Sequence, residues 1–398
     1  MTLLIVIFLT IPVLYLTFSV FYCSFLAVSY FMTSEQQTYD VPGTSRRRYI
    51  IVVPAHNEEA IIARLLESIR NLDYDPRNFK VYVIADNCTD MTARIARQYG
   101  ADTLVRSDEA RKGKGFAIEW ALRMIDPASF DAVVIADADN IIDPGFFRGL
   151  DQVMDRGIRA VQCNNCLANS DESFFTRVIH LSRTINNILY HQAKYKLGLF
   201  SYLMGNGMCF TTSLLREHPW RTGTMAEDYE YYAVLAGHNE PVGFAVDARL
   251  YHQESKGLKA ASRQRLRWSS GRFQIARKFG FGLFMQGIGE RNFKIIDASF
   301  PLLLPNLSLM VNMTAVTLAI AFVIHYFHPV PYVIAWLMML IALQLAYFIS
   351  GMYLAKMPVF SFLFALCFAP FFLLWKGCID ILGLSGVTTG QWGRSGRK

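Results

Sequence analysis

Charged residues are scarce in this chain and are absent from its first 34 positions. Only 18% of the 398 residues are Asp, Glu, Lys or Arg, whereas 53% are hydrophobic, and no acidic residue follows Asp380. This composition excludes an ordinary water-soluble protein. Because the apolar residues gather at both ends, it indicates membrane segments. The net charge of +7 comes from Lys and Arg that cluster beside these segments. That placement fits the cytoplasmic positive bias of membrane proteins better than nucleic-acid binding.

The cysteines argue against a disulfide framework. They number seven and are scattered along the chain, which is typical of a reducing compartment. Cys163 and Cys166 have the spacing of a metal or redox pair. No second pair of Cys or His lies at zinc-site distance from them, so we favour a structural role. The chain also has no fixed-period repeat and no low-complexity tract.

Apolar segments at the two ends predict membrane helices. Residues 1–34 are long enough to cross a bilayer and lack the basic start of a cleaved signal peptide. We expect one transmembrane helix with its amino end outside, because the arginines at 46–48 hold the next domain on the cytoplasmic side. Segments 303–326 and 331–354 are also expected to span. Segment 358–375 begins with a proline and contains another, so we interpret it as re-entrant or interfacial.

Short apolar runs alternate with helical patterns in the middle of the chain. Runs at 49–53, 81–85 and 132–136 predict buried strands, and apolar residues at helical spacing follow the first two. Regular strand–helix alternation predicts an α/β fold with a mostly parallel sheet and short crossovers. Such sheets bind ligands at the carboxyl ends of their strands.

Asp137 and Asp139 follow the third of these strands directly. Residues i and i+2 of an extended chain point the same way. Two carboxylates on one side of a strand are unsuited to a hydrophobic core but can bind a hard divalent cation. Mg²⁺ at such a site is usually bound by substrate phosphates as well. The alternative is a strand-end turn with two solvated acids.

Further polar turns follow in order. The turns at 54–59 and 86–90 end the first two strands, and the loop at 111–115 sets glycines beside lysines, which lets a backbone approach phosphate. The alternative interpretation of residues 111–115 is a flexible basic loop. Glu227 and Asp228 are expected at the start of a helix, where the helix dipole alone could favour carboxylates.

A basic, amphipathic stretch precedes the second group of apolar segments. Residues 256–294 contain ten Lys or Arg, together with Gln264, Arg267 and Trp268. A helix of this composition could lie flat in the membrane interface.

Taken in order, these motifs resemble the family 2 glycosyltransferases. More narrowly, they look like the membrane-integrated polysaccharide synthases, the group of the cellulose, chitin-oligosaccharide and hyaluronan synthases. The resemblance covers roughly residues 48–290 and the tail. Gln264-x-x-Arg267-Trp268, placed between an acidic helix start and a transmembrane cluster, is its specific element. The implied organisation is an amino-terminal transmembrane helix (1–34), a cytosolic GT-A-like (Rossmann-like) domain (45–255), amphipathic interface helices (256–298), transmembrane or re-entrant helices (299–384) and a cytosolic tail (385–398).

The resemblance also implies roles for individual residues. Asp228 would be the general base for the acceptor hydroxyl. Asp139, with Asp137, would bind Mg²⁺ or Mn²⁺, which neutralises charge on the leaving diphosphate. Lys114 would lie in a loop that reaches the nucleotide. The residues implied for nucleotide-sugar binding are Pro54, Ala55, Glu58, Asp86, Lys114, Asp137, Gln264 and Arg267. Those implied for the acceptor are Trp268, Glu227 and Gly207.

The implied activity is inverting, metal-dependent transfer of a hexose from a nucleotide sugar, a UDP-sugar by resemblance. In the first interpretation the acceptor is a growing β-linked polysaccharide and the enzyme is processive. Alternatives are transfer of one sugar to a lipid-linked acceptor, which the small membrane region favours, and a membrane protein that binds sugar nucleotides without turnover. The expected location is a bacterial-type plasma membrane with the catalytic domain in the cytoplasm, and the expected partners include no nucleic acid.

Some positions depart from the family pattern. The second turn has Asn87 and Cys88 after Asp86, where two acids and a glycine are usual, and Ala226 stands where Thr is commoner. The closing motif at 392–397 is similar to the tail of hyaluronan-type synthases, which closes over the nucleotide. A cytoplasmic tail requires that 358–375 does not span.

Overall fold

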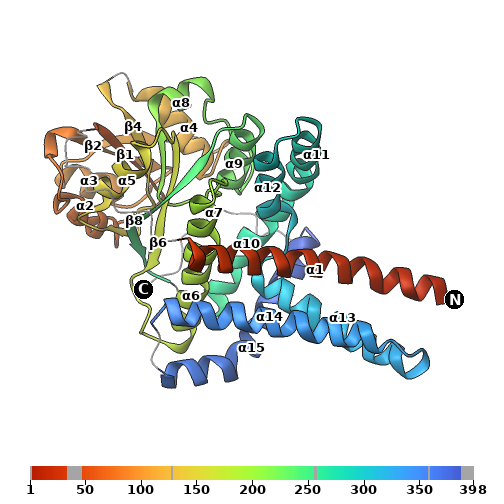
Figure 1. The fold of residues 1–398 in the computed structure, drawn as a ribbon. Helices are drawn as coiled ribbons and strands as arrows, with labels where there is room; N and C mark the ends of the chain where they lie inside the picture. The colour runs from red at the N-terminus through yellow and green to blue at the C-terminus, as the bar shows by residue number, and fades with distance from the viewer. Residues whose placement is uncertain (1, 34–46, 127–128, 255–257, 357–358, 387–398) are drawn as a thin grey trace.

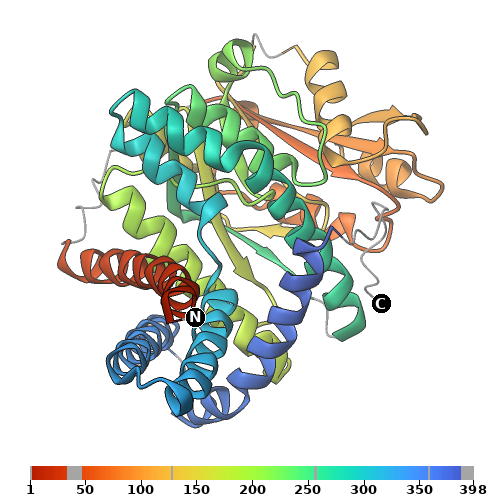
Figure 2. The same cartoon turned by 90° about the vertical axis from the view of Figure 1, so that its right-hand side faces the viewer.

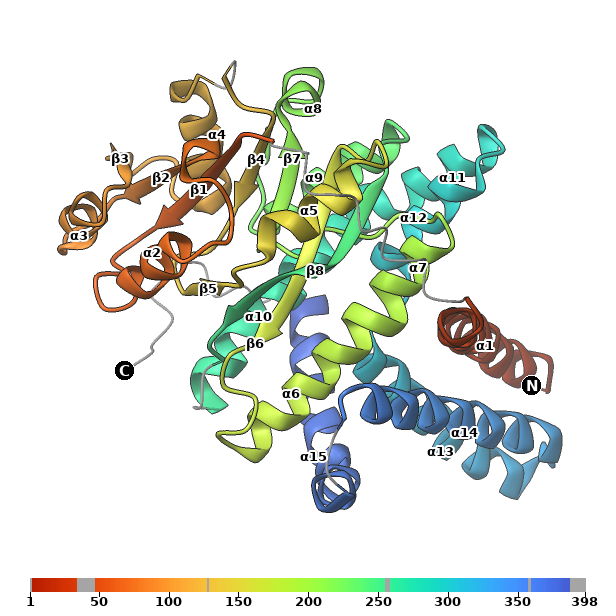
Figure 3. The ribbon, with the colours of Figure 1, turned by 60° about the vertical axis from the view of Figure 1, so that its left-hand side comes forward.

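The computed structural model describes residues 2–33, 47–126, 129–254, 258–356 and 359–386. An α/β domain lies at one end of the molecule, and three long helices run side by side away from it (Figure 1). A group of shorter helices lies between these two parts (Figure 3). The α/β fold and the membrane-type helices predicted from the sequence are therefore both present.

One eight-stranded sheet forms the centre of the α/β domain, in the order β3-β2-β1-β4-β7-β6-β8-β5. The strands are β1 (Tyr49–Ala55), β2 (Phe79–Asp86), β3 (Asp102–Arg106), β4 (Ala132–Ile135), β5 (Asn140–Ile142), β6 (Ala160–Leu167), β7 (Met208–Thr211) and β8 (Val242–His252). Pairing is parallel from β3 to β4 and again between β6 and β8. It is antiparallel where β7 meets β4 and β6, and between β5 and β8. The sheet is thus mixed rather than mostly parallel, because regular strand–helix alternation stops after β4.

Helices cover both faces of the parallel half, which explains its continuous apolar strands. Alternate residues of β1 pack on opposite sides: Ile51 and Val53 belong to the cluster with α2 and α5, whereas Ile50 and Val52 pack with α4. The helices and short turn of this domain are α2 (Ile62–Arg70), η1 (Pro76–Asn78), α3 (Thr92–Gln98), α4 (Lys114–Met124), α5 (Phe146–Met154), α8 (Thr212–Glu217) and α9 (Glu227–Gly237).

A long helix leads from the domain to the bundle. It consists of α6 (Phe174–Thr184), a π-helical segment η3 (Ile185–Gln192) and α7 (Ala193–Lys196). Asn186 and Asn187 lie in this π-helical segment, which interrupts the regular α-helix. Leu181 and Leu189 pack with Ala27 and Tyr347 of the bundle.

The bundle itself is built from α1 (Thr2–Met32), α13 (Leu307–Phe327) and α14 (Pro331–Leu354). Its core is filled by side chains of all three helices, among them Leu16, Val20, Met310, Leu337 and Leu340. By length and composition, four helical stretches could cross a membrane: Leu9–Met32, Leu307–Phe327, Pro331–Leu354 and Cys367–Leu384.

The fourth stretch belongs to α15 (Val359–Leu384) and lies differently. Figure 2 shows α15 lengthwise, whereas α14 is seen nearly end-on. Trp375 donates a hydrogen bond to Ser262 (2.9 Å), and Asp380 accepts one from Ser269 (2.7 Å). Both serines belong to α10 (Leu258–Ile275), so α15 packs along α10 beside the α/β domain. These contacts favour the interpretation of 358–375 as interfacial, which stays a prediction.

From residue 258 onward, the basic stretch at 256–298 is mostly helical, as predicted. After α10 come a π-helical turn η4 (Ala276–Gly280), α11 (Phe281–Gly289) and α12 (Phe293–Leu303). On α11 the side chains of Phe281, Met285 and Ile288 are exposed at helical spacing. An apolar stripe of this kind is what an interface helix requires, although a position in the membrane interface remains a prediction.

A buried ion pair joins the parts of the molecule. Lys194 Nζ of α7 lies 2.8 Å from Asp297 Oδ2 of α12, and both side chains are fully buried. Tyr22 of α1 donates a hydrogen bond to Asp297 Oδ1 at 2.6 Å. One carboxylate therefore receives contacts from the domain and from the bundle.

We expect Asp297→Leu to destabilise the chain by about 3–5 kcal/mol, because it leaves the buried Lys194 ammonium without a counter-charge. Thermal unfolding in detergent would measure this. Lys194→Met/Asp297→Leu, which removes both charges, is the matched control and should recover most of the loss. A double variant as unstable as the single one would contradict the charge argument.

Candidate active site

The carboxyl ends of the neighbouring strands β2, β1 and β4 bring the sequence-predicted residues together. Asp86 ends β2, Ala55 ends β1, and Asp137 and Asp139 come two and four residues after β4. Open α/β sheets place their ligands at this edge.

Asp86 is fully buried, and one of its two oxygens is engaged. Arg106 Nη1 lies 2.5 Å from Oδ1, whereas Oδ2 has no hydrogen-bond partner among the described residues. Burial raises the pKa of Asp86, and the Arg106 guanidinium opposes that shift. An unpaired buried acceptor is costly unless a ligand supplies the donor. Sequence reasoning missed Arg106, because nothing in the sequence pairs it with a residue 20 positions away.

The turns after β1 and β2 are tied to one another. Asn57 has a left-handed backbone (φ 57°), and its side chain accepts a hydrogen bond from the backbone N–H of Thr89 at 2.8 Å. The N–H of Glu58 donates to Thr92 Oγ1 at 2.8 Å. These contacts hold Glu58 in the turn beside the end of β2, where Asp86 lies.

Lys114 connects the acidic groups of the site. Its ammonium donates to Asp137 Oδ1 and to the carbonyl of Gly205, and lies 3.8 Å from Glu227 Oε1. Burial lowers the pKa of Lys114, but Asp137 and Glu227 raise it by more, so the net direction is up. The predicted loop is present but ends at Gly113, because Lys114 is the first residue of α4. The preceding Gly113 (φ 131°) makes the turn into the helix.

A glycine-containing loop separates β7 from this cluster. Gly205 and Gly207 both have left-handed backbones (φ 77° and 63°). A Cβ on Gly205 would lie 3.0 Å from Asp228 Oδ2, whereas a Cβ on Gly207 would lie 2.4 Å from Leu250. Gly205, rather than the predicted Gly207, is therefore the glycine beside the Asp228 carboxylate.

Asn206, between these glycines, fixes the loop. Its side chain accepts from the N–H of Asp137 (3.2 Å) and donates to Asn165 Oδ1 (3.1 Å). The loop is thereby tied to the turn that carries the two aspartates. A role for Asn206 was not foreseen, because a short polar residue between two glycines reads as an ordinary turn.

Glu227 and Asp228 begin α9, as predicted. Burial and the neighbouring Glu227 charge raise the pKa of Asp228 to about 7, against the opposing effects of the Tyr229 N–H and Lys114. Burial also raises the pKa of Glu227, and Lys114 opposes this. Asp228 can therefore exchange a proton near neutral pH.

Helix α10 packs directly on the start of α9. A Cβ on Gly271 would lie 2.8 Å from Cβ of Ala226, so the alanine that departs from the family pattern sits where space is short. Arg267 is close enough to Glu227 to lower its pKa. Neither Gln264 nor Arg267 makes a side-chain hydrogen bond to another described residue. Trp268 is 42% exposed.

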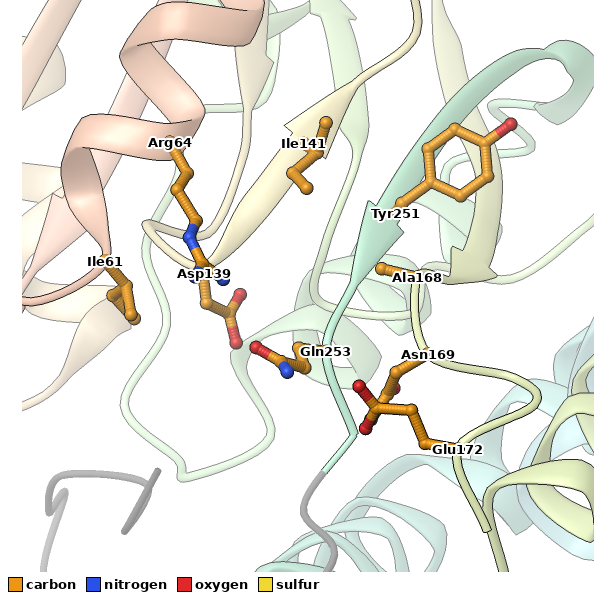
Figure 4. A pocket seen from close by; sticks show the side chains of 9 residues that line it. All are labelled: Ile61, Arg64, Asp139, Ile141, Ala168, Asn169, Glu172, Tyr251 and Gln253. Carbon is orange, nitrogen blue, oxygen red and sulfur yellow. The ribbon is translucent and has the colours of Figure 1, made fainter. Parts of the chain in front are cut away.

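A pocket of about 200 Å³ opens beside Asp139. Figure 4 shows the Gln253 side chain pointing toward the Asp139 carboxylate. Carboxylate and amide oxygens are ligands that suit a hard divalent cation, so the residues present fit Mg²⁺ or Mn²⁺. No sequence motif pointed to Gln253. The lining residues are Ile61, Arg64, Asp139, Ile141, Ala168, Asn169, Glu172, Tyr251 and Gln253.

Two predicted elements lie outside the described residues: Arg46 and the tail motif at 392–397. A second acidic group, formed by Glu217, His218 and Glu240, lies away from this site. Arg159 already pairs with both of its carboxylates.

Comparison with known proteins gives a family and a fold. The family described as "Glycosyltransferase like family 2" matches residues 46–271. Beta-monoglucosyldiacylglycerol synthase of Nostoc sp. is 27% identical over 231 residues, which are 56% of this chain and 48% of that protein. Probable glycosyltransferase YdaM of Bacillus subtilis is 24% identical over 238 residues, 58% of this chain and 56% of that protein. The matches thus span about half the length of these relatives.

One solved structure shares the fold over most of its length. The mannosyltransferase PcManGT from Pyrobaculum calidifontis, solved in complex with GDP-Man and Mn²⁺, superposes with a TM-score of 0.55 at 21% identity. The superposition covers 86% of this chain and 97% of that one. The resemblance to family 2 and the GT-A-like fold are confirmed. The relatives named here are not cellulose, chitin-oligosaccharide or hyaluronan synthases, so the narrower resemblance is not supported.

The raised pKa of Asp228 predicts a pH-dependent cost in stability. The folded chain holds this proton up to about pH 7, whereas the ordinary carboxyl pKa is 3.8. The free energy of unfolding therefore falls as pH rises through this interval. We expect Asp228→Asn to become more stable than the wild type across it, by about 1–2 kcal/mol because the group is partly exposed to solvent. Thermal unfolding between about pH 4 and pH 8 would measure this, with Asp247→Asn as the matched control. An advantage of equal size at every pH would contradict the pKa argument.

Proposed function

The chain belongs to glycosyltransferase family 2, and on that premise we propose that it transfers one hexose from a nucleotide sugar to a membrane-held acceptor. The observation that carries the proposal is the position of Asp228. Its carboxylate lies beside the Lys114–Asp137 cluster, and α10, which packs along α15, contacts the residue two positions before it. A group poised to exchange a proton thus lies where a sugar donor and a membrane acceptor could meet.

The donor would bind along the carboxyl ends of the parallel strands. Pro54, Ala55 and Glu58 would line the base pocket, and the unengaged oxygen of Asp86 would accept a hydrogen bond from the base. A uracil N–H could supply that donor, which supports a UDP-sugar. Lys114 and Asp137 follow along the sheet edge, where the ribose and diphosphate would lie.

Positive groups would balance the diphosphate from two sides. Lys114 would bind it from the sheet, and Gln264 and Arg267, which make no side-chain hydrogen bond to the described chain, would bind it from α10. An Arg guanidinium offers a planar fork of donors that suits phosphate oxygens. Asp139, with Asp137 and Gln253 nearby, would hold Mg²⁺ or Mn²⁺. When bound, that ion neutralises charge on the leaving diphosphate.

Asp228 would accept the proton of the acceptor hydroxyl. A base is most effective when its pKa lies near the working pH, and burial with Glu227 raises that of Asp228 to about 7. The freed oxygen then attacks the anomeric carbon from the side opposite the diphosphate, which inverts that centre. Glu227 and Trp268 would contact the acceptor, and Gly205 leaves room for it next to the base.

Packing of the bundle favours single addition over chain extension. A processive synthase must pass its product through the membrane, yet the described parts of α1, α13 and α14 fill the space between them with their own side chains. The relatives named for diacylglycerol glucosylation also suit a lipid acceptor. We therefore prefer the single-sugar alternative to the polysaccharide synthase that the sequence first indicated.

The membrane arrangement belongs to the same proposal. With the amino end of α1 outside, α13 and α14 return the chain to the cytoplasmic side, and α15 stays there against α10. The catalytic domain and the tail would then share the cytoplasm with the nucleotide sugar.

Product length tests this proposal. The detergent-purified chain, given radiolabelled nucleotide sugars and membrane lipid extract, should form a lipid that carries one sugar. Its rate should rise with pH to a plateau, with an apparent pKa of about 7. Asp228→Asn should lower the rate of transfer by about 10²–10⁴-fold, which is the rate enhancement that a general base usually contributes. A ladder of longer products would instead support a synthase. Wild-type transfer by Asp228→Asn would exclude Asp228 as the base, and no transfer by the wild type would support a binding protein without turnover.

The cation site is tested separately. We expect a chelator or Asp139→Ala to lower transfer by about 100-fold or more, because a bound metal supplies several kcal/mol of charge stabilisation. Mn²⁺ or Mg²⁺ should restore the chelated wild type but not the variant. Asp73→Ala, at a 64% exposed surface position, is the control. Full activity of Asp139→Ala with excess chelator would exclude the site.

A further inference from the structure

Arg183 has no ion-pair partner among the described residues. It lies in the last turn of α6, with its guanidinium 5.9 Å from the ring of Trp268. Its side chain also makes no hydrogen bond with the part of the chain that the structure describes. Trp268 remains 42% exposed, so part of the indole surface beside Arg183 is open.

Two neighbouring arginines of α10 have partners, whereas Arg183, like Arg267, has none among the described residues. Arg265 lies 3.2 Å from the Glu254 carboxylate, and Arg272 donates to the carbonyl of Pro301 at 3.2 Å. No carboxylate of the described chain forms an ion pair with Arg183.

Arg183 faces the acceptor side of the reaction centre. Asn186, one helical turn further on, shares its face, and its side chain lies 3.4 Å from Met204 Sδ. Met204 directly precedes Gly205, and a Cβ placed on Gly205 would lie 3.0 Å from the Asp228 carboxylate. Asn186 also accepts a hydrogen bond from Tyr202 at 2.9 Å. Arg183 therefore comes three residues before a side chain that contacts the loop that flanks the base.

The same stretch of helix touches the membrane-type bundle. A Cβ on Gly351 of α14 would overlap Ile185, which comes two residues after Arg183. Leu181 packs with Ala27 of α1 and Tyr347 of α14. A lipid that leaves the bilayer beside these helices would meet Arg183 and Trp268 before Asp228.

We propose that Arg183 binds a phosphate of the lipid acceptor, next to the hydroxyl that the acceptor presents to Asp228. This inference rests on the proposed function and narrows its acceptor to a phosphate-bearing lipid rather than neutral diacylglycerol. The guanidinium fork matches phosphate oxygens. In the transfer step the hydroxyl proton moves to Asp228, the hydroxyl oxygen bonds to the anomeric carbon, and the bond to the diphosphate breaks. The nucleoside diphosphate leaves, and the acceptor phosphate is unchanged.

The test separates lipids by charge. Bacterial membrane lipid is divided by anion exchange into a neutral and a phosphate-bearing fraction. Each is offered with the donor to the full chain in maltoside micelles, so that only the acceptor supplies phosphate. We expect product from the phosphate-bearing fraction, and a kcat/KM for that fraction lowered by about tenfold or more in Arg183→Gln, the equivalent of about 1.4 kcal/mol. Arg183→Lys should keep part of the activity.

Two controls make the result specific. Arg177→Gln changes an arginine of the same helix that faces Asp171 at 4.0 Å, and it should behave as the wild type. Hydrolysis of the donor without acceptor should be equal in Arg183→Gln and the wild type. If it falls as well, Arg183 serves the donor or the fold and the inference fails.

Other outcomes are also decisive. Product from the neutral fraction alone, or wild-type kcat/KM in Arg183→Gln, would overturn the phosphate site and leave the proposed function intact. An effect of Arg183→Gln that appears only after phosphatidylglycerol vesicles are added, for either fraction, would assign the side chain to bilayer headgroups and overturn the acceptor role. Transfer to neither fraction would remove the proposed function itself.

Discussion

The ammonium group of Lys114 holds the site together. Asp137, Glu227 and Asp228 come from two distant parts of the chain, and without a cation among them their charges would repel one another. Lys114 binds Asp137 and the carbonyl of Gly205, and approaches Glu227. It thereby fixes the distance between the turn after β4 and the start of α9. The acids differ in their distance from this cation. Asp137 is paired with it directly, whereas Asp228 keeps a pKa near neutrality because burial and Glu227 outweigh the effect of the more distant ammonium. Lys114 thus holds the geometry of the cluster and opposes the rise in the pKa of Asp228.

Helix α10 carries this geometry to the membrane-type helices. On one side, Gly271 allows it to pack against Ala226 at the start of α9. On the other, Ser269 donates to Asp380 of α15, and Asn306, which caps α13, donates to the other oxygen of the same carboxylate at 3.0 Å. A buried carboxylate with several donors resists displacement, because any shift leaves it unsatisfied. A movement of α13 or α15 would therefore reach Arg267 and Trp268, which lie on the same helix as Ser269. The contacts that hold α10 in the site therefore also fix the site relative to α13 and α15.

Local sequence patterns predicted most helices and strands. They did not predict the features that depend on contacts between elements distant in the sequence. The β-branched run at 49–53 predicts a strand because a strand buried on both faces needs nothing but apolar side chains. The antiparallel insertion of β7 depends on the path of 174–207, which no local pattern states. The start of α4 was placed two residues too late for a similar reason. A Cβ on Gly115 would lie 2.5 Å from Thr222 Oγ1, so this glycine allows α4 to pack closely, although a glycine next to lysines suggests a flexible loop. Arg106 and Gln253 could not be found at all, since their partners are long-range.

Several charged groups of this junction are paired with an opposite charge. Lys194 has Asp297, Lys376 has Asp380 and Arg265 has Glu254. Burying a charge without a partner costs several kcal/mol, and chains that violate this rule usually do so where a ligand completes the pairing. Asp86 presents a buried, unpaired acceptor at the end proposed for the base. Arg183 is partly exposed and so carries no such burial cost, but it presents a cation without an ion pair among the described residues at the end proposed for the acceptor. Between them lie the Lys114 cluster and Asp228. The two incomplete pairings therefore lie at opposite ends of one path through the site, and they have opposite polarity. A substrate that crosses the path with a hydrogen-bond donor at one end and an anion at the other would complete both.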